Sequence, residues 1–421
     1  MTRDPVAEIV AYSKPLTEPA HEVQRAEGPG NLTAEALRRK LTALAASPFQ
    51  FFRGTFHLMA WDIFQERVHG APKAAAPEGL IVGDLHLENF GVYRGASGAL
   101  VFDVNDFDDV GQGPLDLDLR RLCTSALLLP GLAHGVRVNA ARAIARGWAE
   151  ELEKLGGRFP VPAWDAQKAE GLIAQLLKEK GHKTRDELIA RAAPEKGHAR
   201  LVQNEKFARP AKAWVHAVEQ AMTEYLDSLK QLKAPESPKE YELLDVAYRF
   251  KGTGSLGRLR FTALLGHGSV RRLVELKEAR PSAMDDARAR ALPRDRARTQ
   301  TASIRRLQGD PWPRVAATHL GKLPALGREN EPEEEKLACD RFAQGDSRHE
   351  ELNSYARQCG QVLARLHARA NAPAILHAQW DMQGAARAAV EFAEKYAPLA
   401  EADQKAFAQA HARAAQQLGI A

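Results

Sequence analysis

The stretch from Ile81 to Asp109, IVGDLHLENFGVYRGASGALVFDVNDFDD, constrains the chain more than any other part of the sequence. Two short and mostly apolar runs lie in it, Ile81–Val82 and Leu100–Val104, and each is followed by polar residues. Asp84 follows the first run and Asp106 follows the second, with a glycine-rich turn between them. We therefore predict two strands that deliver polar side chains to one site.

The spacing of these polar residues indicates a kind of chemistry. Asp84 and Asn89 are five positions apart, the spacing that separates the base from the metal-holding amide in phosphoryl-transfer loops. Carboxylate and amide oxygens suit a hard ion such as Mg²⁺, which usually takes one or two protein groups together with nucleotide phosphates. The alternative is an ordinary loop, because such side chains often cap turns and face water. The combination with Asp106 favours a magnesium-nucleotide site.

Composition narrows the class of protein. A chain of 421 residues is expected to form two or three packed units or one large two-lobed enzyme. Its content of 44% apolar and 27% charged residues is ordinary for a soluble protein. The net charge of +5 comes with interspersed acidic residues, so nucleic acid is a disfavoured partner. Three scattered cysteines argue against disulfides and zinc. We find no signal-peptide pattern and no apolar run that could span a bilayer, and so expect a cytoplasmic protein without membrane partners.

The chain before the acidic stretch holds one residue of interest. Residues 1–30 lack periodicity and are predicted to form an irregular arm, and a helix capped by Thr33 should follow. The segment Phe49–Phe64 is dense in aromatic rings, which core packing explains. Arg53 lies among these rings and needs a carboxylate or phosphate partner, so it is a possible site residue.

Helical patterns dominate after the acidic stretch. Asp116 and Asp118 precede an apolar helix, and one of them can brace the acidic loop or cap that helix. Further helices are predicted over 139–155, 164–180, 187–193 and 211–232, and later over 353–370, followed by two Ala-rich helices.

The composition changes after a Pro-rich and charged segment, Lys233–Lys239, which reads as a linker. Strands are predicted over 243–250, 258–265 and 271–279, with a further strand over 322–326 and a charged connector over 328–336. Gly252, Gly254 and Gly257 form a GxGxxG pattern between the first two strands.

Three interpretations of this pattern compete. A dinucleotide-binding unit needs a helix after the glycines and an acid about 20 residues on, which Glu278 nearly supplies. The stretch before Gly266 is too short for that helix, and its alternating residues indicate a hairpin. A glycine loop between antiparallel strands, followed by Lys277, is the kinase arrangement that covers nucleotide phosphates. A plain turn with a surface lysine is the remaining alternative, and the acidic stretch favours the kinase-like one.

Several segments of the chain resemble motifs of known protein families. The segments VGDLHLENFG, VFDVNDFDD and DLDLRRL look like the catalytic and metal loops of aminoglycoside and choline phosphotransferases, within the protein-kinase-like superfamily. More closely, the segments FFRG, GDLHLENFG, NDFDD, GTGSLGR, ELKEA and LARLHARA resemble, in this order, an uncharacterised bacterial family, the domain of unknown function 2252. These motifs extend from about Ser47 to Ala370.

The resemblance implies a role for each matching residue. Asp84 corresponds to the catalytic base, and Asn89 and Asp106 correspond to the metal ligands. Lys277 corresponds to the lysine that holds the nucleotide phosphates. The glycine loop, Gly252, Gly254, Ser255 and Gly257, would bind the nucleotide. His86 and Asp108 are further possible site residues, and ATP and Mg²⁺ are the implied cofactors.

The order of the motifs departs from that of kinases. In kinases the glycine loop and the lysine come first, whereas here the catalytic and metal loops precede them. We therefore predict an α+β, two-lobed, circularly permuted kinase-like fold with a large helical lobe. Val82 stands where a histidine is usual, and no glutamate lies between Glu278 and Glu329 to orient Lys277. Asp285, Asp286 or another acid is a candidate for this task, and without one we expect nucleotide binding without fast turnover.

These inferences divide the chain into an arm and helix (1–48), the catalytic and metal loops with a helical lobe (49–235), a β-rich nucleotide lobe (236–330) and C-terminal helices (331–421). The leading hypothesis is an ATP- and Mg²⁺-dependent phosphotransferase acting on an unidentified hydroxyl acceptor, for which a small molecule is one candidate class. The alternatives are a nucleotidyl transferase of the same fold, a metallophosphoesterase, and a catalytically silent nucleotide-binding protein.

Overall fold

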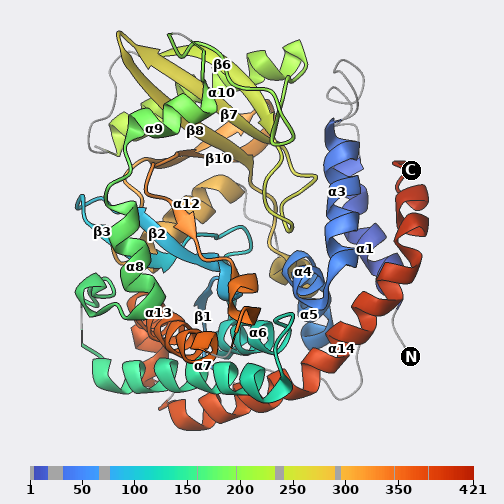
Figure 1. The fold of residues 1–421 in the computed structure, drawn as a ribbon, viewed down its shortest axis with the longest axis vertical. Coiled ribbons are helices and arrows are strands. Elements are labelled where there is room, and N and C mark those ends of the chain that lie inside the picture. The colour runs from blue at the N-terminus through green and yellow to red at the C-terminus, as the bar shows by residue number, and fades with distance from the viewer. Residues whose placement is uncertain are drawn as a thin grey trace.

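The computed structural model describes residues 4–17, 32–65, 76–158, 160–195, 197–232, 241–289, 295–345, 347–377 and 379–421. The predicted linker at Lys233–Lys239 lies outside these residues. The fold is mixed α+β, with a curled six-stranded sheet at one end and a layer of long helices at the other (Figure 1). Within the described residues, no helix has the length and apolar character needed to cross a membrane.

The six-stranded sheet is antiparallel throughout, with strand order β5-β6-β7-β8-β10-β9. Its strands are β5 (Phe207–Ala208), β6 (Glu242–Arg249), β7 (Arg260–His267), β8 (Val270–Glu278), β9 (Val315–Leu320) and β10 (Leu323–Glu329). The four predicted strands are confirmed to within a few residues. The interpretation of the glycine pattern as a hairpin is also confirmed, because β6 and β7 pair directly across it.

Helices cover this sheet and connect its strands. Helix α10 (Lys212–Gln231) packs on it closely enough that a Cβ atom on Gly327 of β10 would lie 2.4 Å from the ring of Tyr225. Two helices, α11 (Ala283–Ala287) and α12 (Arg296–Leu307), lie between β8 and β9 in the chain. Helix α9 (Arg185–Ala192) contacts β8. The predicted helices at 187–193 and 211–232 are thus confirmed.

The helical layer is built from α6 (Asp116–Leu127), α7 (His134–Leu155), α13 (Ser347–His377) and α14 (Met382–Gln417). Helices α7 and α13 cross where each has a glycine. A Cβ atom on Gly147 would lie 2.2 Å from the carbonyl oxygen of Arg357, and one on Gly360 would lie 2.1 Å from that of Ile144. Two Ala-rich helices were predicted to follow the helix over 353–370. Helix α13 has a kink at Asn371, where the backbone is non-helical, and α14 follows as one continuous helix that retains Pro398. The predicted helix over 164–180 is reduced to η4 (Ala166–Lys168) and α8 (Gly171–Lys180).

Two small sheets lie between the large sheet and the helical layer. Strand β1 (Glu78–Ile81) pairs with β4 (Gly111–Pro114), and β2 (Phe90–Arg94) pairs with β3 (Leu100–Val104) and with β11 (Glu335–Lys336). The two apolar runs of the acidic stretch therefore belong to different sheets. The connector predicted over 328–336 is shorter than expected, because β10 extends to Glu329 and β11 begins at Glu335.

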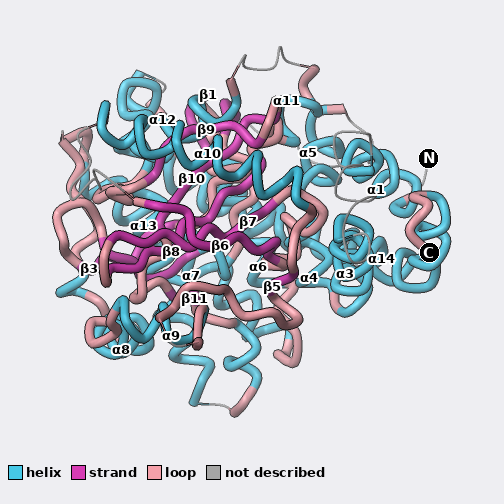
Figure 2. Tube along the Cα trace, turned by 90° about the horizontal axis from the view of Figure 1, so that it is seen from above, coloured by secondary structure: helices cyan, strands magenta, loops and turns pink. Residues whose placement is uncertain are grey.

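The N-terminal segment is more ordered than predicted. Instead of an irregular arm, residues Pro5–Ser13 form helix α1, which is followed by η1 (Lys14–Thr17). The side chain of Asp4 accepts a hydrogen bond from the backbone N–H of Val6 (2.9 Å) and Pro5 occupies the first turn, so the helix start is well capped. Helices α3 (Leu32–Ala46), α4 (Pro48–Gly54) and α5 (Phe56–Phe64) follow. Helices α1, α3 and α14 lie together on one flank (Figure 2).

Candidate functional site

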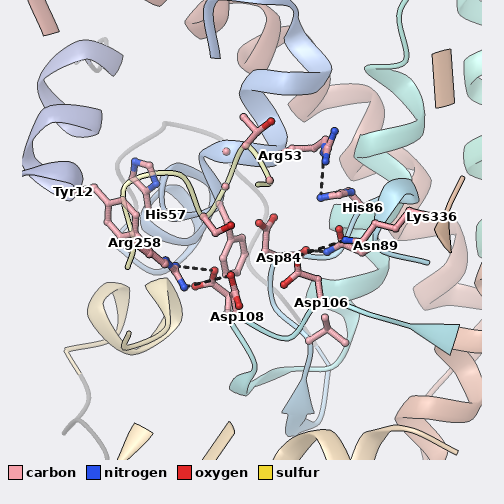
Figure 3. Close-up of a pocket in the computed structure, with 18 residues that line it drawn as sticks. Tyr12, Arg53, His57, Asp84, His86, Asn89, Asp106, Asp108, Arg258 and Lys336 are labelled. Atoms are coloured by element: carbon pink, nitrogen blue, oxygen red, sulfur yellow. Dashed lines mark hydrogen bonds and ion pairs between the residues drawn. The ribbon is translucent and has the colours of Figure 1, made fainter. Parts of the chain in front are cut away.

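The predicted site residues gather around two small cavities between the large sheet and the helical layer. The first cavity, of about 60 Å³, is lined by Arg53, Asp84, His86, Asn89, Asp106, Asp108, Gly252, Gly254 and Ser255, together with other residues (Figure 3). The second, of about 70 Å³, is lined by Lys277 and shares Asp106, Asp108, Gly252 and Ser255 with the first. Gly257 lines neither cavity. It packs on α3, where a Cβ atom on it would lie 2.6 Å from Leu37.

Asp84 lies just after β1 and is held by a buried arginine. Its Oδ1 accepts hydrogen bonds from Nε (2.9 Å) and Nη2 (2.5 Å) of Arg121, a residue of α6. Within the described chain, Oδ2 accepts no hydrogen bond, and Gly254 of the glycine loop lies above it. Burial raises the pKa of Asp84 to about 6, the guanidinium of Arg121 opposes this shift, and the charge of Asp109 adds to it.

A buried carboxylate braces the backbone that leads to Asp84. Asp118 accepts hydrogen bonds from the N–H groups of Val82 and Gly83, both at 2.8 Å. His367 lies 3.2 Å from the same carboxylate and accepts a hydrogen bond from the indole N–H of Trp148 (3.2 Å). The interpretation of Asp118 as a brace of the loop is therefore confirmed. Its partner His367 belongs to the LARLHARA segment of α13.

Asn89 closes the acidic loop and presents an unused oxygen. It ends the short helix η3 (Leu87–Asn89), is only 3% exposed, and donates through Nδ2 to the backbone oxygen of Asp84 (2.6 Å). Its Oδ1 is buried and has no hydrogen-bond partner among the described residues. A buried acceptor of this kind is costly unless something else binds it.

Asp106 lies opposite two lysines. Its carboxylate is 3.8 Å from Nζ of Lys277 and 3.6 Å from Nζ of Lys336. Burial alone would raise the pKa of Asp106, but the two ammonium groups outweigh it and hold the pKa well below its usual range. Lys336 lies in β11 and was predicted only as part of the charged connector.

The acid that pairs with Lys277 is Asp108. Nζ of Lys277 forms a close ion pair with Oδ2 of Asp108, whose carboxylate is also 3.5 Å from Arg258. Burial lowers the pKa of Lys277, and the two nearby aspartates limit the decrease. The two acids suggested from the sequence do not form this ion pair; Asp286 instead accepts a hydrogen bond from the indole of Trp61 (2.7 Å).

The glycine loop lies over the acidic loop and is held there by N-terminal helices. Gly252 has φ +76°, a conformation that favours glycine. Lys40 of α3 donates to the backbone oxygen of Gly254 (3.1 Å), and the hydroxyl of Thr253 donates to Gln50 of α4 (3.1 Å). A Cβ atom on Gly254 would be 3.7 Å from Oδ2 of Asp84, so the loop directly adjoins this carboxylate.

Arg53 has its carboxylate partner within the protein. Its Nη1 lies 2.5 Å from Glu88, and its guanidinium lies over the ring of Phe49 at 5.6 Å. Burial and the charge of Arg53 hold the pKa of His86 well below its ordinary value, so the ring is neutral. A neutral ring has one acceptor nitrogen. The N–H of Glu88 approaches Nδ1 at 3.1 Å and Nε of Arg53 approaches Nε2 at 3.4 Å, so the neutral ring can accept only one of these two hydrogen bonds at a time.

Several residues at the site could not be identified from the sequence. Tyr12 of α1 and His57 of α5 stack with ring centroids 3.9 Å apart and both line the first cavity, as does Arg258. Lys40 contacts the glycine loop from α3, a helix whose sequence gave no indication of a role at the site. Arg121 belongs to the DLDLRRL segment, and that motif was the one available indication of its importance.

Comparison with known families gives one result. A model of the family described as "Uncharacterized protein conserved in bacteria (DUF2252)" matches residues 32–410. The chain belongs to this family. The match covers the site elements from α3 to α13 and leaves out α1 with Tyr12. No curated protein and no solved structure matches the chain.

The donor atoms in this member of the family suit Mg²⁺. The described residues contain no cluster of three or more histidine, cysteine or acidic side chains that could form a metal site by themselves. Asp106 and the unpartnered Oδ1 of Asn89 are two hard oxygen donors, the number Mg²⁺ commonly takes from protein when phosphates supply more. The residues present therefore fit a magnesium ion that arrives with a nucleotide.

Proposed function

We propose that this protein is an ATP- and Mg²⁺-dependent phosphotransferase with a circularly permuted kinase-like fold. The observation that carries the proposal is the contact between two distant parts of the chain. Lys277 of the large sheet lies 3.8 Å from Asp106 of the acidic stretch, and the glycine loop lies over Asp84. An unrelated surface lysine and an unrelated turn would have no reason to meet these acids in one buried place.

A second contact supports the permutation. Asn371, near the end of α13, accepts a hydrogen bond from the N–H of Leu80 (2.6 Å) and donates one to its carbonyl oxygen (2.8 Å). The end of α13 is thus fastened to β1, which leads into the loop that carries Asp84. In kinases the corresponding helix runs directly into the catalytic loop. Here the same neighbours are joined by hydrogen bonds instead of by a continuous chain.

The connection between the two lobes also supports a kinase-like fold. The chain leaves the large sheet at the end of β10 and joins the β2-β3 sheet through β11. An ion pair between Arg328 and Glu334 (2.7 Å) spans this connection beside the second cavity. The nucleotide would then lie between the glycine loop, Lys277 and this connector.

The proposed mechanism assigns one task to each polar group. Oδ2 of Asp84 carries no hydrogen bond within the described chain. It accepts the proton of the acceptor hydroxyl while the oxygen of that hydroxyl attacks the γ-phosphorus of ATP. Lys277 and the N–H groups of the glycine loop bind phosphate oxygens, and ADP leaves. Asn89 and Asp106 would hold Mg²⁺, which neutralises the charge that develops on the phosphates.

The size of the cavities adds a requirement. Cavities of about 60 and 70 Å³ are far smaller than the roughly 300–1,000 Å³ typical of ligand pockets. We infer that the glycine loop lifts when a nucleotide binds. The hydrogen bonds of Lys40 to Gly254 and of Thr253 to Gln50 are the contacts that this movement would break.

The test combines nucleotide binding with transfer of label. Purified protein is incubated with Mg²⁺ and ATP labelled at the α or the γ phosphate, and binding is measured by the rise in melting temperature. The variants are Asp84→Asn, Asp106→Asn and Lys277→Met. Lys322→Met is the control because Lys322 is an exposed lysine in the turn between β9 and β10 of the same sheet.

We expect Mg²⁺-dependent binding that is weakened in Lys277→Met and Asp106→Asn and is unchanged in Lys322→Met. Release or transfer of the γ label that is lost in Asp84→Asn would support a phosphotransferase. Transfer of the α label would instead indicate a nucleotidyl transferase. Absence of Mg²⁺-dependent nucleotide binding would refute the proposal.

A further inference from the structure

Arg121 is one of the most buried charged groups of the protein. Its side chain is 0% exposed, and its guanidinium lies over the rings of Phe52 and Phe56, at 4.1 and 4.8 Å. It donates to the backbone oxygen of Phe52 (2.7 Å) and to the sulfur of Met59 (3.6 Å). Among the described residues, its other hydrogen bonds are the two to Oδ1 of Asp84.

The energetics of such a group call for an explanation. Desolvating a guanidinium is costly, and a buried ion pair seldom stabilises a protein more than apolar residues of the same size would. Asp84 itself borders the cavity, with 21% of its side chain exposed. A gain in the stability of the fold therefore does not readily explain a fully buried arginine behind a partly exposed aspartate. Its effect on the aspartate explains its position better.

The geometry shows what that effect is. The planar fork of the guanidinium directs Nε and Nη2 to the same carboxylate oxygen, and the box formed by Phe52, Phe56 and Met59 fixes the fork. Rotation of the Asp84 carboxylate would break both hydrogen bonds. Oδ1 is thus fixed on the inner side, and Oδ2 is left on the side of Gly254, where a Cβ atom would lie 3.7 Å from it. Figure 3 shows the side chain of Asp84 among the residues that line the first cavity.

We propose that Arg121 is a positioning residue that locks the carboxylate of Asp84 so that Oδ2 faces the acceptor hydroxyl. This inference rests on the proposed phosphotransferase function. It also accounts for two of the sequence motifs, since Phe52 comes from FFRG and Arg121 from DLDLRRL, and Arg121 donates hydrogen bonds both to Phe52 and to Asp84.

The neighbouring residue provides a matched control. Arg120 is also buried, at 4% exposure, forms an ion pair with Asp116 (2.8 Å) and lies over the ring of Phe392 at 5.2 Å. None of these three residues lines either cavity. Substitutions at positions 120 and 121 therefore disturb similar buried ion pairs, and only the one at position 121 touches the site.

The test compares Arg121→Lys, Arg121→Ala and Arg120→Lys in the full-length protein. The rate of γ-phosphoryl transfer from ATP, to water or to an acceptor, is measured together with KM for ATP and the melting temperature. A misplaced reacting group can cost about 100-fold in rate, so we expect kcat to fall by about that factor in both Arg121 variants with KM for ATP unchanged. Guanidinium chloride at non-denaturing concentration should partly restore kcat in Arg121→Ala. Arg120→Lys should keep the wild-type kcat.

Equal kcat in Arg121→Lys and wild type, or equal losses in Arg120→Lys and Arg121→Lys, would overturn the inference. Crystal structures of the wild type and of Arg121→Lys give a readout that does not depend on turnover. The carboxylate of Asp84 should be rotated or disordered in the variant, and an unchanged carboxylate would also overturn the inference. If the wild type transfers no phosphoryl group, the proposed function fails and these structures alone decide the role of Arg121.

Discussion

Substitution of Asp118 by asparagine tests how the acidic loop is held. The carboxylate of Asp118 is 0% exposed and interacts with three groups: the N–H of Val82, the N–H of Gly83 and the imidazole of His367. Asparagine has nearly the same shape but carries one acceptor oxygen and one NH₂ group. Whichever way the amide turns, its NH₂ group must face at least one buried donor.

The expected cost follows from these contacts. Leaving one buried donor unsatisfied costs about 1–3 kcal/mol, and the remaining hydrogen bonds lose their charge assistance. We therefore expect Asp118→Asn to lower the free energy of unfolding by about 2–4 kcal/mol, measured by urea denaturation at 25 °C. Hydrogen exchange should report the same change locally, as faster exchange of the amides of Val82 and Gly83.

A surface aspartate serves as the control. Asp165 caps the short helix η4 and accepts a hydrogen bond from the N–H of Gln167 (3.0 Å), with 40% of its side chain exposed. Asparagine caps helices about as well as aspartate, so Asp165→Asn should change stability by less than about 0.5 kcal/mol. The reasoning is refuted if Asp118→Asn is as stable as this control, or if the amide of Gly83 stays fully protected in the variant.

Three further outcomes follow from the site. Gly83→Ala should lower the free energy of unfolding by at least about 2 kcal/mol in urea, because φ is +87° and the new Cβ would lie 2.4 Å from the carbonyl oxygen of Asp109; a neutral substitution would contradict the described loop. Burial lowers the pKa of Lys40 from 10.5 to about 7. Between these two pH values Lys40 is therefore protonated in the unfolded chain and mostly unprotonated in the folded protein. Stability attributable to Lys40 therefore rises with pH across that window, by at most about 1.4 kcal/mol per unit, and comparing urea unfolding of wild type and Lys40→Met at pH 7 and 9 should show this difference. Because Asp84 must be ionised to accept a proton and its pKa is raised to about 6, the rate of phosphoryl transfer should fall tenfold per unit as pH drops below that value, and a flat profile would argue against a role as base.

Local sequence patterns determined much of the secondary structure. The alternation and the glycine turns located β6, β7 and β8, and the apolar periodicity located α10 and the central part of α13. The same patterns failed where a signal was present but not recognised. Asp4 followed by Pro5 is a helix-start signal. The prediction did not use this signal and assigned the segment that forms α1 to an irregular arm. These successes and errors concern interactions over a few residues, which a local pattern records.

Only part of the candidate site could be predicted from local sequence patterns. The spacing of Asp84 and Asn89 and the position of Lys277 after the glycine loop are local features, and the sequence alone identified them. Their gathering around adjoining cavities depends on the pairing of distant segments, which the sequence could suggest only through a family resemblance. The acid that holds Lys277 shows the difference, because Asp108 is near Asp106 in the chain and far from the lysine that it binds.

The tertiary structure alone decided which buried groups support the site. Arg121 and Asp118 lie in the first turns of one helix. The sequence offered Asp116 or Asp118 as a brace of the acidic loop or as a helix cap, and it gave Arg121 no role. The choice is made when α6 packs beneath the acidic loop, so that Arg121 reaches Asp84 and Asp118 reaches Val82 and Gly83. The physical reason is that the orientation of a buried charge is set by the few partners that can satisfy it. In this protein those partners come from distant parts of the chain.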